Sequence, residues 1–338
     1  MYVSANTLDD LLRKVYAKLL RSKRTTSPSR GSCVEESGVL LRLLNPRARL
    51  SRTETRGRIF SSLGELLWYL TRRSDLGFIE YYIPRYVKES EDGSTVFGGY
   101  GERMFAYGGI NQVANVLTLL RARPDSRRAV IQVFGADDLS KTRKTVPCTC
   151  TLQFLIRQGQ LEMFVTMRSN DAYLGLPHDV FAFTMLQEIM ACSLGCKLGK
   201  YSHAVGSLHL YEQNRADAEV YLDEGFQSTT IAMPSMPTVD PWRSIANVMS
   251  VEQSVRNGSF PVFAQLDIDE YWRDICRLLV IYKLSKFRKA DEILELKEQM
   301  HSSVFDMYID QRFENAQQPQ VGPVQVPMEF NLEIGTGS

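Results

Sequence analysis

The middle of the chain, residues 151–195, constrains the fold more than any other segment. Residues 151–169 contain two runs of apolar, β-branched and aromatic side chains on either side of Gln158 and Gly159, which predicts a β-hairpin. Residues 180–195 form a long apolar run that ends at a glycine, as a helix commonly does. Residues 203–214 then indicate a further strand that leads into a helix. Strands and helices therefore alternate, and the predicted fold class is α/β.

The flanking segments continue this mixture. Helices are predicted at residues 7–21, 60–71 and 111–122, strands at 38–44 and 129–135, loops at 23–37 and 89–101, and helical periodicity with dense charge at 268–300. A chain of 338 residues in this class often forms one domain. We expect a main core at 1–225, a C-terminal part of the same domain with a helical extension at 226–314, and a flexible Gln- and Pro-rich tail at 315–338.

Composition and charge argue against several classes of protein. Charged residues make up 23% and the net charge is +1, which is ordinary for a globular protein and lacks the basic excess that general binding to DNA requires. No apolar run reaches the roughly 18 residues of a membrane span, so we expect no membrane partner. The N-terminal residues carry charges throughout, unlike a secretory leader, so the six cysteines are expected to be free thiols in a reducing cytoplasm.

Two cysteines one residue apart, Cys148 and Cys150, follow Pro147 at the start of the predicted hairpin. Zinc ligands are usually separated by two to four residues and need a second pair elsewhere. Cys192 and Cys196 lie four apart, but in an apolar helix where buried core thiols are the common outcome. We therefore predict no metal. A core cysteine is also more frequent than a nucleophile, and only its neighbours favour Cys148 for that role.

Four arginines are candidates for binding an anion. Arg168 follows an apolar run, so its guanidinium should be partly buried and would need an anionic partner. Arg127 and Arg128 stand beside the start of a predicted strand, and Arg30 lies in the Ser-rich loop. A single arginine is most often a solvated surface charge, so none of these is decisive alone.

Three further candidates have ordinary structural explanations. Asp179 opens the predicted helix, where Asp is a favoured N-cap residue. His209 and Tyr211 would share one face of a strand. A buried, hydrogen-bonded histidine and a core tyrosine are the structural interpretations of that pair.

Together these segments resemble the thymidylate synthase family. The resemblance runs from about Arg30 to Asn214, over half of the chain. Six motifs occur in the family's order: GELLWY (64–69), YG (100–101), PC (147–148), RSND (168–171), LGLP (174–177) and HLY (209–211).

The resemblance implies a thymidylate-synthase-like mixed sheet with packed helices, and three catalytic residues. Cys148 would attack carbon 6 of a pyrimidine nucleoside monophosphate, Glu65 would assist proton transfers through water, and Tyr100 would lie near the proton removed from carbon 5. Because nearby cations lower a thiol's pKa, the arginines are expected to lower the pKa of Cys148.

The resemblance also implies a homodimer with shared active sites and 5,10-methylenetetrahydrofolate as cosubstrate. The arginines and a serine would hold the 5′-phosphate, with Arg127 and Arg128 supplied by the partner subunit, while the HLY pair would bind the sugar 3′-hydroxyl and an aspartate would face the folate. In chain order the implied binding residues are Arg30, Arg127, Arg128, Arg168, Ser169, Asp171, His209 and Tyr211.

The chain departs from the synthases at Asp179, where they have Asn. The Asn amide donates to O4 of uracil and accepts from the N3 hydrogen, and cytosine presents the reverse pattern. A protonated Asp, or an Asp facing N3-protonated cytosine, satisfies cytosine. In this feature the chain is similar to the deoxycytidylate and cytidylate 5-hydroxymethylases of the family.

Three other departures concern the reaction. Thr149 replaces a His, Ser207 replaces an Asp, and residues 71–99 contain no tryptophan to guide hydride transfer from the folate. The last residues, EIGTGS, also lack the apolar end that closes over the folate in synthases. These losses favour addition of water over delivery of hydride.

The sequence therefore predicts a cytidylate (CMP or dCMP) 5-hydroxymethylase. Two enzymatic alternatives remain, a thymidylate synthase and a dUMP hydroxymethylase. A third alternative, from another class, is an inactive nucleotide- or RNA-binding homologue.

Overall fold

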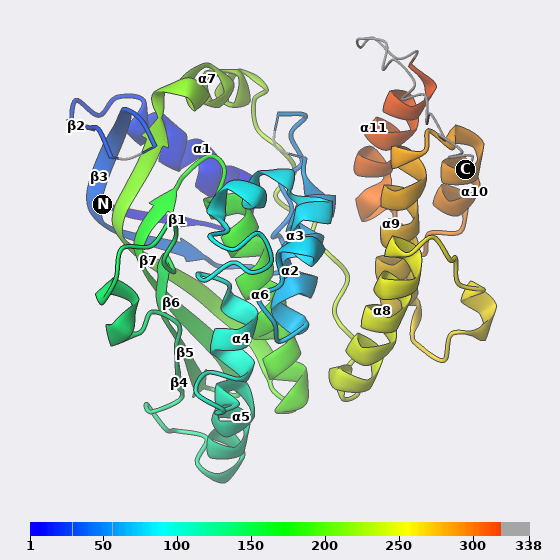
Figure 1. The fold of residues 1–338 in the computed structure, drawn as a ribbon, viewed down its shortest axis with the longest axis horizontal. Coiled ribbons are helices and arrows are strands. Elements are labelled where there is room, and N and C mark those ends of the chain that lie inside the picture. The colour runs from blue at the N-terminus through cyan, green and yellow to red at the C-terminus, as the bar shows by residue number, and fades with distance from the viewer. Residues whose placement is uncertain (29, 56, 319–338) are drawn as a thin grey trace, which may run out of the picture.

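A mixed seven-stranded sheet forms the centre of the protein. The computed structural model describes residues 1–28, 30–55 and 57–318 (Figure 1). The strand order is β1-β3-β7-β6-β5-β4, with β2 paired to β3; the β1–β3 and β6–β7 pairs are parallel and the others antiparallel. The strands are β1 (Tyr2–Ala5), β2 (Thr25–Thr26), β3 (Cys33–Leu43), β4 (Val130–Gln132), β5 (Thr149–Arg157), β6 (Gln160–Asp171) and β7 (Lys197–Tyr211).

Helices cover one face of this sheet, and further helices extend beyond it. They are α1 (Leu8–Leu19), α2 (Ile59–Leu70), α3 (Leu76–Tyr82), α4 (Tyr100–Phe105), α5 (Gln112–Ala122), α6 (Leu176–Ser193), α7 (Arg215–Asp223), α8 (Pro241–Arg256), α9 (Glu270–Lys286), α10 (Ala290–Glu298) and α11 (Asp306–Gln317). A 3₁₀ turn, η1 (Pro84–Glu89), follows α3. The predicted α/β class, with packed helices and a helical C-terminal extension, is confirmed.

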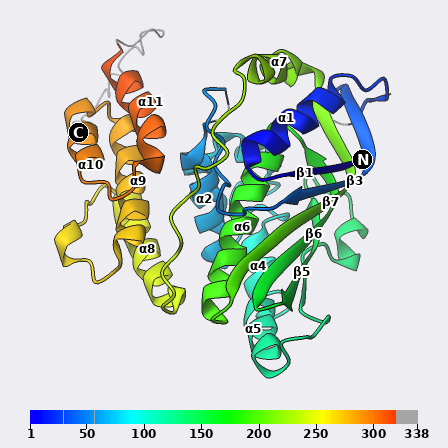
Figure 2. The same ribbon diagram turned by 180° about the vertical axis from the view of Figure 1, so that it is seen from behind.

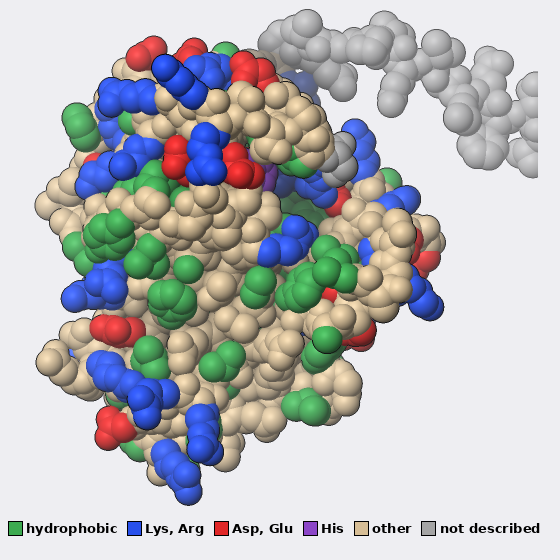
Figure 3. Space-filling view, turned by 90° about the vertical axis from the view of Figure 1, so that its left-hand side faces the viewer, with side chains coloured by type: hydrophobic (Ala, Val, Ile, Leu, Met, Phe, Trp, Pro, Cys, Tyr) green, Lys and Arg blue, Asp and Glu red, His purple; other side chains and the backbone are tan. Residues whose placement is uncertain are grey.

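The two faces of the sheet differ in burial because side chains alternate along each strand. One row of paired residues, Leu152, Val165, His203 and Leu41, is completely buried beneath helices. The adjacent row on the opposite face includes the half-buried Phe164. Figure 3 views the side of the molecule that carries the sheet, and hydrophobic side chains are scattered over its middle. This second face is only partly covered in the single chain.

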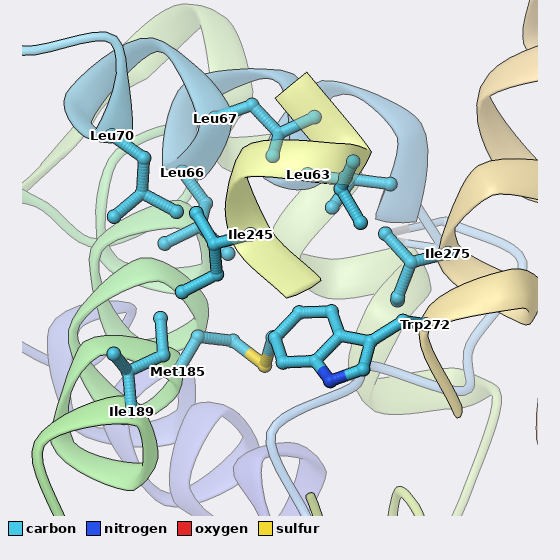
Figure 4. Close-up of a pocket in the computed structure, with 10 residues that line it drawn as sticks. Leu63, Leu66, Leu67, Leu70, Met185, Ile189, Ile245, Trp272 and Ile275 are labelled. Carbon is cyan, nitrogen blue, oxygen red and sulfur yellow. The ribbon is translucent and has the colours of Figure 1, made fainter. Parts of the chain in front are cut away.

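The buried helix α6 links the sheet to the C-terminal helices. It packs on β6 and β7 and against α2 and α8, and it lies between the sheet and the α8–α11 group (Figures 1 and 2). A small cavity among α2, α6, α8 and α9 is lined only by apolar side chains, including Leu66, Met185 and Trp272 (Figure 4). It is a gap in core packing, and it offers no polar group to a nucleotide.

The structure corrects three sequence-based boundaries. The predicted loop at 23–37 contains β2 and the first half of β3, because Cys33–Ser37 pair with Ser207–Tyr211 of β7 despite their polar sequence. The strand predicted at 129–135 is only β4. The tail predicted from residue 315 begins inside α11, and its residues 319–338 lie outside the described part of the chain.

Candidate active site

Cys148 lies at the entry to β5, beside Arg168 on the neighbouring strand. The Arg168 backbone N–H donates to the Cys148 carbonyl at 2.8 Å, and its guanidinium donates to the carbonyls of Pro147 (2.9 Å) and Val146 (3.1 Å). These bonds hold Arg168 Nη2 3.6 Å from the thiol Sγ. The hairpin thus places a fixed cation against the predicted nucleophile.

The pKa of Cys148 is nevertheless raised in the single chain. Burial of the thiol is the main cause, and Arg168 opposes it. The lowering of the Cys148 pKa that was expected from four arginines is therefore not found in the single chain. The reason is geometric: Arg168 contacts the thiol, the charge of Arg30 acts more weakly, and no interaction in the described residues joins Arg127 or Arg128 to Cys148.

The other arginines occupy different surroundings. Arg30 is exposed and forms an ion pair with Glu89 at 2.6 Å, so a substrate phosphate would compete with this carboxylate. Arg127 and Arg128 are exposed beside the start of β4. Lys and Arg side chains gather at the lower end of the face in Figure 3, the end at which α5 lies.

Glu65 is buried on α2 and is held by two tyrosines. The hydroxyls of Tyr86 (2.7 Å) and Tyr69 (3.0 Å) both donate to its Oε1. Burial raises the pKa of Glu65, and the Tyr86 bond opposes this shift. A raised pKa brings a carboxyl group closer to the pH range in which general acid–base catalysis operates. Sequence reasoning missed both tyrosines, although Tyr69 stands one helical turn after Glu65.

Tyr100 projects from the start of α4 towards the beginning of β5. Its hydroxyl accepts a hydrogen bond from the backbone N–H of Thr149 at 3.2 Å, and its ring stacks on Phe183 at 6.2 Å. Burial raises its pKa, and the charges of Asp179 and Cys148 add to this shift. Tyr100, Asp179 and Cys148 are thus close enough to interact electrostatically.

Asp179 lies inside α6, which corrects its predicted N-cap position. The helix begins at Leu176 with Gly175 as N-cap, and the Asp179 N–H already donates to the Gly175 carbonyl at 3.0 Å. The side chain of Asp179 is buried, and its Oδ2 accepts from Asn170 Nδ2 at 2.7 Å. Burial and the charge of Glu65 raise its pKa well above the usual value. Burial thus favours the neutral form of this carboxyl group in the ligand-free protein.

The remaining predicted residues follow Arg168 or lie on the neighbouring strand β7. His209 and Tyr211 share one face, with ring centroids 4.9 Å apart, and His209 pairs in register with Asp171. Burial lowers the pKa of His209. Asp171 Oδ1 accepts from the backbone N–H groups of Tyr173 and Leu174, and Ser169 lies half-buried between Arg168 and Asn170.

A family model described as thymidylate synthase matches residues 47–253. The chain belongs to the thymidylate synthase family. The resemblance found in the sequence is thereby confirmed, and the matched range contains every predicted site residue except Arg30. This family consists of one-carbon transferases that act on pyrimidine nucleoside monophosphates, as the sequence predicted.

Two named relatives are phage proteins. A deoxyuridylate hydroxymethyltransferase of Bacillus phage SP01 is 32% identical over 197 residues, which are 54% of this chain and 51% of the relative. A deoxyuridylate hydroxymethyltransferase of Pseudomonas phage M6 is 34% identical over 157 residues, which are 46% of this chain and 45% of the relative. The chain thus spans about half the length of the curated relatives it matches.

Two departures from the thymidylate synthase pattern have clear structural settings. Ser207 donates to Glu35 Oε2 on β3 at 2.7 Å, so it helps to join the two strands near His209. Thr149 is fully buried, and its Oγ1 has no hydrogen-bond partner in the described structure. Thr149 contributes instead through its backbone N–H, which holds the Tyr100 hydroxyl.

Two absences concern the described residues. No group of three or more His, Cys, Asp or Glu side chains is arranged there to hold a metal ion. None of the helices in that part of the chain is long and apolar enough to cross a membrane.

Proposed function

We propose that this protein is a cytidylate 5-hydroxymethylase, which adds a hydroxymethyl group to carbon 5 of CMP or dCMP. The observation that carries the proposal is the buried carboxyl group of Asp179, at the position where synthases have an amide. A carboxyl group can pair with the cytosine edge, which presents a ring nitrogen acceptor and an amine donor. The proposed chemistry lies within residues 1–225, with 226–314 completing the same domain.

The chemistry begins with Cys148 as nucleophile. Its thiolate forms a bond to carbon 6, and the electrons of the ring double bond move towards carbon 5 and the C4–N3 unit. Arg168, 3.6 Å from the sulfur, stabilises the thiolate that must form. When bound, methylenetetrahydrofolate supplies the one-carbon unit.

Tyr100 and Glu65 are placed for the proton transfers that follow. The Tyr100 hydroxyl accepts from Thr149, so its own hydrogen and second lone pair remain available near carbon 5. Glu65 can move protons through water, because its Oε2 is not used by the two tyrosines. Once carbon 5 carries the one-carbon unit, loss of its proton together with departure of tetrahydrofolate would leave an exocyclic methylene on the pyrimidine. Water then adds to that carbon, and the electron pair returned to the ring expels the Cys148 thiolate from carbon 6.

Asp171 has the chemistry expected of a residue that faces the folate. Its Oδ1 is taken by two backbone N–H groups, and the half-buried side chain keeps Oδ2 for another donor. A pterin ring carries such N–H donors. The acceptor that Asp171 offers therefore fits the cosubstrate.

A second candidate function is hydroxymethylation of dUMP. The names of both phage relatives favour it, because each is called a deoxyuridylate hydroxymethyltransferase. Hydride transfer, as in a synthase, is disfavoured because residues 71–99 contain no tryptophan. The two hydroxymethylase candidates share all the chemistry above and differ in the base that residue 179 accepts.

Product analysis with CMP, dCMP and dUMP side by side tests the proposal. We expect a 5-hydroxymethyl product from a cytidylate, with release of tetrahydrofolate and no near-ultraviolet rise from dihydrofolate. Turnover of dUMP alone would replace the proposal by the second candidate. Formation of dihydrofolate would identify a synthase, and binding without turnover an inactive homologue.

We also propose that the active unit is a homodimer in which Arg127 and Arg128 of one subunit complete the site of the other. Both arginines are exposed and remote from the contacts of Cys148, and the partly covered face of the sheet is available for a second copy. A phosphate held only by Arg30 and Arg168 would lack half of the positive charge that the four predicted arginines supply.

Mixing two inactive variants tests this assembly. Cys148→Ser and Arg128→Ala enzymes should each be inactive alone and should regain up to about a quarter of wild-type activity after subunit exchange, since one hybrid site would be intact. Pairing Cys148→Ser with Arg168→Ala is the matched control. Cys148 and Arg168 are both expected to serve the site of their own subunit, so each site of this hybrid would carry one defect and no activity should return. Recovery in this control would mean that Arg168 also reaches the partner's site. No recovery in the first mixture, with exchange demonstrated, would contradict shared arginines.

A further inference from the structure

A buried chain of hydrogen bonds leads from β7 to Asp179, and the mechanism above does not use it. The Tyr201 hydroxyl lies 2.7 Å from His203 Nδ1, and His203 Nε2 lies 3.1 Å from Asn170 Oδ1. Asn170 Nδ2 lies 2.7 Å from Asp179 Oδ2. All four side chains are less than 9% exposed. A polar chain of this kind in a core must be fully hydrogen-bonded to be tolerated.

The direction of these bonds follows from the Tyr201 end. Among the described residues, the Tyr201 hydroxyl has His203 Nδ1 as its only hydrogen-bond partner. A buried O–H without an acceptor is costly, so Tyr201 donates and Nδ1 accepts. Burial lowers the pKa of His203 to about 3, so the ring is neutral and carries its single hydrogen on Nε2.

The remaining links are then fixed. His203 Nε2–H donates to Asn170 Oδ1, which orients the amide so that its N–H, and never its oxygen, faces Asp179. Gly175 makes room for this arrangement, because a Cβ there would stand 3.0 Å from Asn170 Nδ2. A donor held against a carboxyl oxygen stabilises the carboxylate over the neutral acid.

We propose that Tyr201 and His203 are positioning residues: they hold the Asn170 amide as a donor to Asp179 and thereby shift the proton shared with a bound cytosine from Asp179 onto ring nitrogen N3. The inference rests on the proposed function, since it requires a cytosine base opposite Asp179. The proton leaves one carboxyl oxygen and binds N3, so a neutral acid and a neutral base become a carboxylate and a cytosinium ion.

This transfer has two consequences for the reaction. A protonated N3 withdraws electrons from the ring, which makes carbon 6 a better target for Cys148. The carboxylate then accepts from both N3–H and the amine, whereas it would repel O4 of uracil. A neutral carboxyl group alone could place its proton on either oxygen and satisfy either base, so the chain of bonds is what makes Asp179 selective.

The test observes the N3 proton directly. CMP or dCMP labelled with ¹⁵N at N3 is bound to the Cys148→Ser enzyme, and the nitrogen NMR signal reports whether N3 carries hydrogen. We expect protonated N3 in this parent protein. Adding His203→Leu, which removes the donor to Asn170, should return N3 largely to its neutral form. His203→Gln is the matched control, because the amide of Gln can still donate at the Nε2 position and should preserve protonation.

Turnover provides a second readout in enzymes that retain Cys148. His203→Leu should lower kcat for the cytidylate by about tenfold or more with a smaller change in KM, because the Asn170 amide, no longer held by His203, can turn and lose its charge-assisted hydrogen bond to the Asp179 carboxylate. Turnover of dUMP, which gains nothing from N3 protonation, should fall less. A structural role alone would lower both in proportion. If His203→Leu fails to fold, Asn170→Leu carries the same comparison.

The outcomes separate the two proposals. Neutral N3 in the parent complex, or equal protonation in parent and His203→Leu, overturns the positioning role while leaving a cytidylate enzyme intact. Failure of the protein to bind or turn over any cytidylate overturns the proposed function itself.

Discussion

Replacing Cys148 with serine should reduce release of tritium from carbon 5 of the substrate by more than about a thousandfold, the scale on which removal of a nucleophile acts. A serine hydroxyl does not ionise near neutral pH, and Arg168 cannot compensate for that. The substitution changes one atom at the entry to β5, so thermal unfolding should be nearly unchanged.

Cys150→Ser is the matched control for this prediction. Cys150 stands two residues along β5 and is also half-buried, but in the described structure its thiol forms no hydrogen bond with the Arg168 guanidinium. Burial raises its pKa as well. We expect Cys150→Ser to keep most of the activity. The reverse pattern, with Cys148→Ser active and Cys150→Ser inactive, would move the nucleophile to Cys150.

Exchanging Asp179 for asparagine should shift the preference from cytosine towards uracil by about 1–3 kcal/mol, roughly 5- to 150-fold in the ratio of kcat/KM values. The asparagine oxygen can still accept from Asn170, so the helix and its contact with β6 should persist. Its N–H is the donor to O4 that a carboxylate lacks. Measuring kcat/KM for CMP, dCMP and dUMP with both proteins decides the matter.

The position of Asp179 inside α6 determines what an unchanged base preference of Asp179→Asn would mean. A helix N-cap role would have predicted no change, because Asn caps as well as Asp, but Gly175 holds the N-cap position. An unchanged cytosine-to-uracil ratio would therefore show that residue 179 does not select the base. The names of the two phage relatives, which both specify deoxyuridylate, would then be the better guide to the substrate.

The sequence by itself determined the elements whose signals are local. The turn at Gln158 and Gly159 and the periodic helix at 112–122 were predicted close to their observed bounds, and the apolar run of α6 was predicted as a helix, although it begins at Leu176 and not at residue 180. These patterns depend on neighbouring residues, so they are visible without a fold. The ordered motifs likewise identified the family and named Cys148 and Arg168, which the hairpin then brings into contact.

The tertiary structure decided everything that depends on pairing between distant segments. The polar half of β3 is a strand only because β7 satisfies its backbone groups, and no local signal shows that partner. Tyr86 reaches Glu65 from η1, and His203 reaches Asn170 across 33 positions of sequence. The raised pKa of Asp179 also depends on tertiary structure, because burial raises it and the neighbouring Asn170 amide opposes the shift, and both exist only once the sheet and α6 have packed together.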